Sequence, residues 1–155
     1  MTGEEIQALL DTQRAFFNSG ATLSVDFRIE SLRKLYDAVK AHEDDIHAAL
    51  TADLGKSAYE GFMCESGLAL TEISYMIKHT RKLARRTTVR TPLAQFASHS
   101  FTQAVPYGNT LVMSPWNYPF LLTIDPLADA IAAGNTVILK PSAYSPATSS
   151  IIERI

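Results

Sequence analysis

Two polar side chains, Asn117 and Lys140, each follow a short apolar stretch and are of types that can do chemistry. Asn117 lies in residues 114–119 (SPWNYP), and Lys140 opens residues 140–142 (KPS). An amide offers two donors that suit a developing oxyanion, and an ammonium group offers three that suit ribose hydroxyls or a phosphate. Spacing alone assigns neither role, because a loop with two prolines can equally be a rigid turn whose tryptophan fills the core.

The elements around these residues predict one βαβ unit. Residues 110–113 and 136–139 are short apolar strands, and residues 120–133 form a helix that Gly134 ends. A helix between the two strands, joined to each by a short connection, implies that the strands are parallel. Ligands of open parallel sheets bind beyond the carboxyl ends of the strands. If the strands are neighbours, ~4.8 Å apart, or one strand apart, Asn117 and Lys140 emerge on the same rim.

The chain before this unit is helical in pattern. Helices are expected over about 6–17, from a Ser24 cap to residue 40, over 42–54, and as one long helix from Ser57 through Leu83. In the second helix Arg28 is expected on the polar side, and the apolar stripe is expected to consist of Ile29, Leu32, Leu35 and Val39. Residues 87–99 resemble an extended linker, residues 100–105 a strand, and Ser145 is expected to cap a last helix.

Composition excludes several classes of function. The chain has 155 residues, 46% of them hydrophobic, and its 14 basic and 16 acidic residues favour neither nucleic acid nor an anionic membrane as partner. The basic run from Lys78 to Arg90 is interpreted as a solvated face or subunit contact. A single cysteine, Cys64, allows no internal disulfide and favours a cytoplasmic location, and no segment predicts a membrane span.

Three other chemical candidates are set aside. Cys64 lies within a predicted helix with no histidine near it, so a buried structural thiol is expected rather than a nucleophile. Asp125 and Asp129, four residues apart, are expected to be surface or capping charges rather than an acid–base pair. The four histidines show no ligand spacing, so no metal site is predicted.

Several motifs closely resemble the N-terminal part of the aldehyde dehydrogenase family. They are residues 106–109 (PYGN), 114–119 (SPWNYP) and 133–142 (AGNTVILKPS), with agreement also at 53–57 (DLGKS) and 90–93 (RTPL). Together with Tyr118, the last two are most similar to the class 3 branch, which handles fatty and aromatic aldehydes. The resemblance spans nearly the whole chain.

The resemblance implies oxidation of an aldehyde to a carboxylic acid with NAD or NADP, through a cysteine thiohemiacetal, hydride transfer and thioester hydrolysis. Asn117 would hold the oxyanion, and Lys140 would bond the adenosine ribose. Tyr118 and Leu122 would line the aldehyde tunnel. The other positions matching cofactor-binding ones are Met113, Ser114, Pro115, Trp116 and Ser142.

The chain departs from the family pattern in two ways that bear on cofactor choice and on activity. Where the family often has a glutamate that binds the ribose 2′-hydroxyl and repels a 2′-phosphate, this chain has Ala143, so NADP is expected to be tolerated along with NAD. The family's nucleophilic cysteine, general-base glutamate and glycine-containing cofactor turn fall outside residues 1–155. The chain alone is therefore expected to be inactive and, with an unpaired sheet edge, poorly soluble.

The expected fold is α/β: N-terminal helices, an oligomerisation strand and the first βαβ unit of a Rossmann-like parallel sheet, as in a truncated aldehyde dehydrogenase. The implied division is a helical segment 1–90, a linker and oligomerisation arm 91–109, and an incomplete cofactor domain 110–155, with a homodimer as the expected assembly. Two alternatives stay open. One is a non-catalytic short chain that binds a full-length homologue, and the other is a related acyl-CoA-forming reductase.

Overall fold

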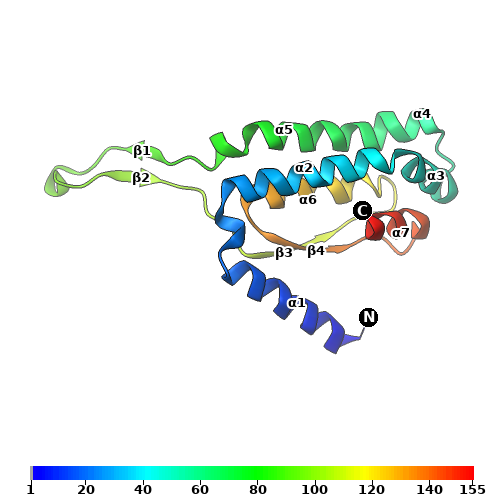
Figure 1. Ribbon diagram of the computed structural model, residues 1–155, viewed down its shortest axis with the longest axis horizontal. Coiled ribbons are helices and arrows are strands. Elements are labelled where there is room, and N and C mark those ends of the chain that lie inside the picture. The colour runs from blue at the N-terminus through cyan, green and yellow to red at the C-terminus, as the bar shows by residue number, and fades with distance from the viewer. Residues whose placement is uncertain (1) are drawn as a thin grey trace.

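A layer of long helices lies over a short parallel sheet in the computed structural model, which describes residues 2–155 (Figure 1). Helix α6 lies between the α2–α5 pair and the sheet, and α1 packs on the opposite side of the sheet. The main helices are α1 (Gly3–Asn18), α2 (Val25–Ala41), α3 (Glu43–Leu54), α4 (Ala58–Gly61), α5 (Gly67–Leu83), α6 (Leu121–Ala133) and α7 (Pro146–Arg154). The strands are β1 (Thr87–Val89), β2 (Ser100–Thr102), β3 (Asn109–Met113) and β4 (Thr136–Lys140), and short helical turns cover Ala21–Leu23, Phe62–Ser66 and Leu93–Gln95. The expected mixed α/β fold is confirmed.

The hydrophobic core is built from buried side chains of α2, α3, α5, α6 and α7. Leu32 and Val39, both in the apolar stripe predicted for α2, are completely buried. Ile73 of α5 and Phe120, just before α6, are buried with them. Burying such side chains contributes about 1.5–3 kcal/mol each, which is why these helices stay together.

The sheet is the expected parallel pair. Strands β3 and β4 are direct neighbours, in a register that runs from Asn109 opposite Thr136 to Met113 opposite Lys140. The chain crosses from one to the other through α6. Both carboxyl ends therefore lie side by side at one edge.

Arg28 is buried, contrary to the expectation that it lies on the polar side of its helix. Its guanidinium donates from Nε to the carbonyl of Thr22 (2.7 Å) and from Nη1 to the carbonyl of Ala132 (3.3 Å). Carbonyls at helix ends lack intrahelical donors, so an arginine that supplies several is stable there. Gly134 (φ 91°) provides the space for this guanidinium, because a Cβ at this position would lie 2.5 Å from Cζ of Arg28.

The single helix expected from Ser57 to Leu83 is interrupted. Residues Phe62–Ser66 form one π-helical turn between α4 and α5. Gly67 is required just after this turn, because a Cβ there would lie 2.7 Å from the carbonyl oxygen of Phe62. A π turn holds more residues than an α turn and so changes which side chains face inward. Here Glu65 and Ser66 are buried.

Residues 87–102 form a hairpin arm that projects from the body (Figure 1). The linker expected over 87–99 is thus partly a strand, β1, paired antiparallel with β2, and β2 is shorter than expected. The guanidinium of Arg86 stacks 4.4 Å from the Phe101 ring centroid and joins the two sides. Strands of three residues that are exposed on both faces carry no alternating pattern, which is why periodicity missed β1.

Helix α7 is capped by Asp53 of α3 rather than by Ser145. Ser145 occupies the N-cap position, but its side chain makes no cap hydrogen bond. Instead the Asp53 carboxylate accepts from the backbone N–H groups of Ala147 (3.1 Å) and Thr148 (2.7 Å) and from the Thr148 hydroxyl (2.7 Å). A partner 94 positions away in sequence is invisible to local cap rules.

We expect Asp53→Ala to lower the free energy of unfolding by about 1–2 kcal/mol, because two N–H groups at the start of α7 lose their acceptor. Asp37→Ala, at an exposed position within α2, is the control and should leave stability within about 0.5 kcal/mol of the parent. Urea denaturation measures both. Equal effects of the two substitutions would contradict the capping role.

Asp125 is half-buried between α5 and α6 and is not the surface charge expected from the sequence. Its Oδ1 atom is buried without a hydrogen-bond partner among residues 2–155. Burial, with smaller contributions from the charges of Glu72 and Asp129, raises the pKa of Asp125 to about 6 from an ordinary 3.8. Burial also raises the pKa of Asp129.

This shift predicts a pH dependence of stability. The folded protein keeps the Asp125 proton at pH values where the unfolded chain has lost it, so the free energy of unfolding falls as pH rises from about 4 through about 6. Asp125→Asn should flatten that fall and raise stability at pH 8 by about 1 kcal/mol, a figure reduced for solvent screening. Urea denaturation at about pH 4.5 and at about pH 8, with Asp37→Asn as the control, measures this difference in stability. An unchanged slope in Asp125→Asn would contradict it.

Candidate functional site

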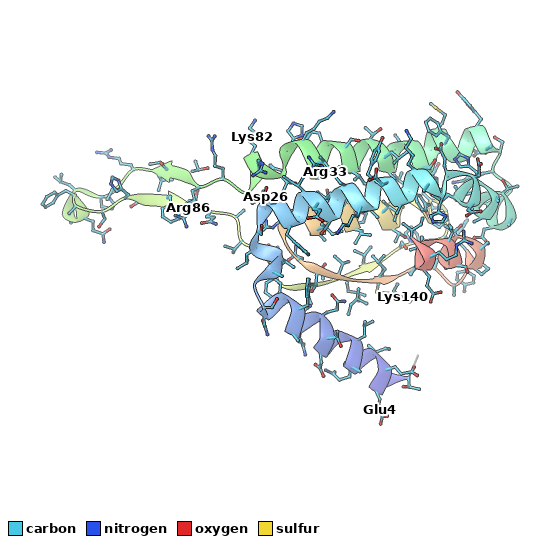
Figure 2. The ribbon with its side chains drawn as sticks, in the orientation of Figure 1. Glu4, Asp26, Arg33, Lys82, Arg86 and Lys140 are labelled. Carbon is cyan, nitrogen blue, oxygen red and sulfur yellow. The ribbon has the colours of Figure 1, made fainter. Side chains whose placement is uncertain are left out.

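The two strand ends form one rim, as expected. Met113 pairs with Lys140, and the N–H of the next residue, Ser114, donates to the Lys140 carbonyl (3.3 Å). The Lys140 side chain is exposed at the end of β4, beside α7 (Figure 2), and its ammonium has no hydrogen-bond or ion-pair partner in the described part of the chain. The residues that follow β3 and β4 therefore share one surface.

The loop 114–119 is buried at both ends and exposed in the middle. Ser114 and Pro119 are buried, whereas Trp116 is 55% exposed and Asn117 is also exposed. The alternative in which the tryptophan fills the core is therefore wrong for this structure, since Phe120 takes that place.

The hydroxyl of Thr123, in α6, connects the two buried ends of the loop. Its Oγ1 lies 2.6 Å from Ser114 Oγ and 2.6 Å from the Pro119 carbonyl oxygen. The Ser114 side chain is thus turned into the protein, and only its backbone faces the rim.

A buried ion pair underlies the loop. Lys56 Nζ lies 2.5 Å from Glu65 Oε1, and both side chains are shielded from solvent. Glu65 Oε2 accepts from the backbone N–H groups of Phe120 (2.9 Å) and Leu121 (2.9 Å). Lys56 Nζ donates to the Asn117 carbonyl (3.1 Å) and lies 4.2 Å from the centroid of the Tyr118 ring.

The Asn117 amide is left available by this arrangement. Its backbone carbonyl is bonded to Lys56, while its side chain has no hydrogen-bond partner among residues 2–155. A free amide on a loop whose backbone is held can donate to an oxygen that gains negative charge, with little reorganisation when the charge appears.

Several apolar side chains close to Asn117 in sequence are exposed. Met113 and Trp116 are more than half exposed, and Tyr118 and Leu122 are about 40% exposed. Exposed aromatic and aliphatic groups next to a few polar donors are typical of sites for small organic molecules. Ser142 differs, because it is buried and its Oγ accepts from the Tyr144 N–H (3.2 Å) within its own turn.

The remaining candidates lie elsewhere. Cys64 lies in the π turn and is half-buried, less than the buried structural thiol expected from the sequence. No group of three or more His, Cys, Asp or Glu side chains within residues 2–155 is arranged to hold a metal ion. None of the helices described is both long and apolar enough to cross a membrane.

Sequence reasoning did not identify Lys56 and Glu65 as part of the site. Lys56 lies in the short connection between two expected helices and Glu65 lies within the second of them. Their contacts in the loop are 61 and 55 positions further along the chain. The one local signal is Glu65 itself, a carboxylate next to Cys64 and Ser66 on a helix face that turns inward.

Comparison with known proteins adds an independent finding. The model of the aldehyde dehydrogenase family matches residues 1–155. The chain is 42% identical over 142 residues to 4,4′-diaponeurosporen-aldehyde dehydrogenase of Staphylococcus aureus, and the matched segment covers 92% of this chain and 31% of that protein. It is 40% identical over 152 residues to the dimeric NADP-preferring aldehyde dehydrogenase of Canis lupus familiaris, covering 97% of this chain and 33% of that protein.

A solved structure agrees in fold. The substrate-bound state of Staphylococcus aureus AldH superposes with a TM-score of 0.93 at 41% sequence identity, covering 96% of this chain and 32% of that one. The chain thus spans about a third of the length of these relatives.

Proposed function

The chain belongs to the aldehyde dehydrogenase family, and from this premise we propose that its native gene product oxidises aldehydes to carboxylic acids with NAD or NADP. The reaction proceeds through a cysteine thiohemiacetal, with the cysteine and the general-base glutamate outside residues 1–155. The observation that carries the proposal is the free Asn117 amide on a loop whose backbone is hydrogen-bonded to buried charges.

Asn117 has the role of oxyanion donor in this proposal. When a thiolate attacks the aldehyde carbon, the carbonyl oxygen gains negative charge and needs a donor that is already in place. The fixed Asn117 backbone directs the amide, and the exposed Tyr118 and Leu122 side chains give the aldehyde an apolar surface. Such a surface suits fatty or aromatic aldehydes, the substrates expected of the class 3 branch.

The rim also fits a dinucleotide cofactor, which supplies the acceptor for the hydride. The free ammonium of Lys140 is suited to ribose hydroxyls, and the backbone of residues 113–116 with the Trp116 and Met113 side chains offers a surface for the nicotinamide half. Ser142 would contribute through its backbone or the shape of its turn, because its Oγ is already bonded.

Assembly and location follow the same proposal. The hairpin arm ends in Leu93 and Phe96, which are more than 80% exposed, and such a projecting apolar tip suits contact with a second subunit in a homodimer. We assign residues 1–90 to the helical segment, 91–109 to the arm region and 110–155 to the cofactor domain. A cytoplasmic setting fits a chain whose one cysteine can form no internal disulfide.

Asn117→Ala tests the catalytic assignment. In the native gene product we expect kcat for aldehyde oxidation to fall ~10²–10³-fold while the cofactor Kd changes little, because the amide acts only when charge develops. Stopped-flow and steady-state NADH formation measure this. Asn18→Ala, at the exposed end of α1, is the control. Normal turnover by Asn117→Ala would contradict the oxyanion role, and a wild type without aldehyde oxidation would contradict the function.

Ala143 predicts dual cofactor use, because this exposed position carries no carboxylate to repel a 2′-phosphate. We expect wild type to use both NAD and NADP, and Ala143→Glu to raise the KM for NADP about tenfold or more with a smaller effect on NAD. Ala143→Gln has nearly the same size without the charge and should retain NADP. A strong NAD preference in the wild type would argue against this assignment.

A further inference from the structure

The loop that carries Asn117 has few internal means of holding its shape. Pro115 and Pro119 lack N–H groups, and α6, whose N-cap residue is Phe120, has no side-chain cap from its own segment. The two N–H groups that would otherwise be unpaired at this helix start, those of Phe120 and Leu121, are bonded to Glu65. The loop therefore depends on contacts from outside it.

Lys56 and Glu65 supply those contacts at two points. Glu65 fixes the end of the loop through Oε2, and Lys56 fixes its middle through the hydrogen bond to the Asn117 carbonyl (3.1 Å). The pair itself joins the two points, because Lys56 Nζ lies 2.5 Å from the other carboxylate oxygen, Oε1. The Lys56 carbonyl is in turn fixed by the Thr51 hydroxyl (2.6 Å).

We propose that Lys56 and Glu65 are positioning residues of the reaction: the buried pair sets where the Asn117 amide points when the oxyanion forms. This inference rests on the proposed aldehyde oxidation. Neither side chain needs to touch the substrate, because Lys56 holds the backbone of the residue whose side chain does. Lys56 also stacks on Tyr118, so the neighbouring apolar surface is held by the same ammonium group.

A purely structural role makes a different prediction from a positioning role. A pair that only stabilises the fold lowers the melting temperature and the active fraction, but not the turnover of the molecules that remain folded. A pair that positions Asn117 loses its effect on turnover once the Asn117 amide is gone. Coupling between the two sites therefore separates the two roles.

The test uses the native gene product, with turnover normalised to the folded fraction at saturating cofactor. We expect Glu65→Gln to lower kcat ~10–100-fold with little change in the KM for NAD, because displacement of a catalytic group by about 1 Å is enough for such a loss. In the Asn117→Ala background the same substitution should cost no more than about threefold. Asp53→Asn, which weakens a cap supplied to α7 from another helix, is the matched control and should leave kcat unchanged.

A second variant covers the case in which Glu65→Gln does not fold. Lys56→Arg keeps the charge next to Glu65 but moves the donor away from the Asn117 carbonyl, and its kcat loss should likewise disappear in the Asn117→Ala background. Independent, multiplying losses in either double variant would overturn the proposal.

Amide hydrogen exchange provides a readout without activity. Amides of Phe120 and Leu121 should exchange at least about tenfold faster in Glu65→Gln than in wild type and keep their protection in Asp53→Asn. Unchanged exchange in Glu65→Gln would overturn the proposal. A wild type that oxidises no aldehyde contradicts the proposed function instead, so the two failures are distinguishable.

Discussion

A buried ion pair, Lys56 with Glu65, joins the helical first half of the chain to the loop that follows β3. Both charges lie in the interior, where isolated ions are costly, and each is stabilised by the other and by backbone groups of residues 117–121. The π turn places Glu65 there, and Gly67 permits that turn by leaving space beside the Phe62 carbonyl. The helices before the sheet thus determine the shape of the rim as well as covering the core.

In the proposed reaction, this dependence gives the N-terminal helices a role in the chemistry at the carboxyl ends of the strands. Strand pairing fixes the start of the loop, through Ser114 and Lys140, and the Glu65 cap fixes the start of α6. Between them the exposed Trp116, Asn117 and Tyr118 are free to meet a ligand. A rigid backbone with free side chains is the arrangement that electrostatic catalysis requires.

Local patterns predicted the parts of the structure that depend on near neighbours. The apolar stripe of α2, the strand–helix–strand order and the end of α6 at Gly134 all depend on residues within a few positions of one another, and all are confirmed. The missed strand β1 is too short to show a pattern, and several other errors concern contacts between distant residues. Arg28 is buried by the end of α6, Asp125 by α5, and the cap of α7 comes from Asp53. Lys56 and Glu65 were missed for the same reason, since only the folded chain brings them to Asn117. The strand–helix–strand order located the rim, the resemblance to a family suggested roles for its residues, and the packing explains what holds it.

In the proposed reaction the Asn117 amide, held through its backbone by Lys56, binds the oxygen that becomes negative. A crystal structure of the native gene product with an aldehyde-derived adduct on its nucleophile measures this directly. We expect Asn117 Nδ2 at ~2.7–3.1 Å from the adduct oxygen, with the Lys56 contact to the Asn117 carbonyl intact. An adduct oxygen bound by other donors, with the Asn117 amide turned away, would contradict it.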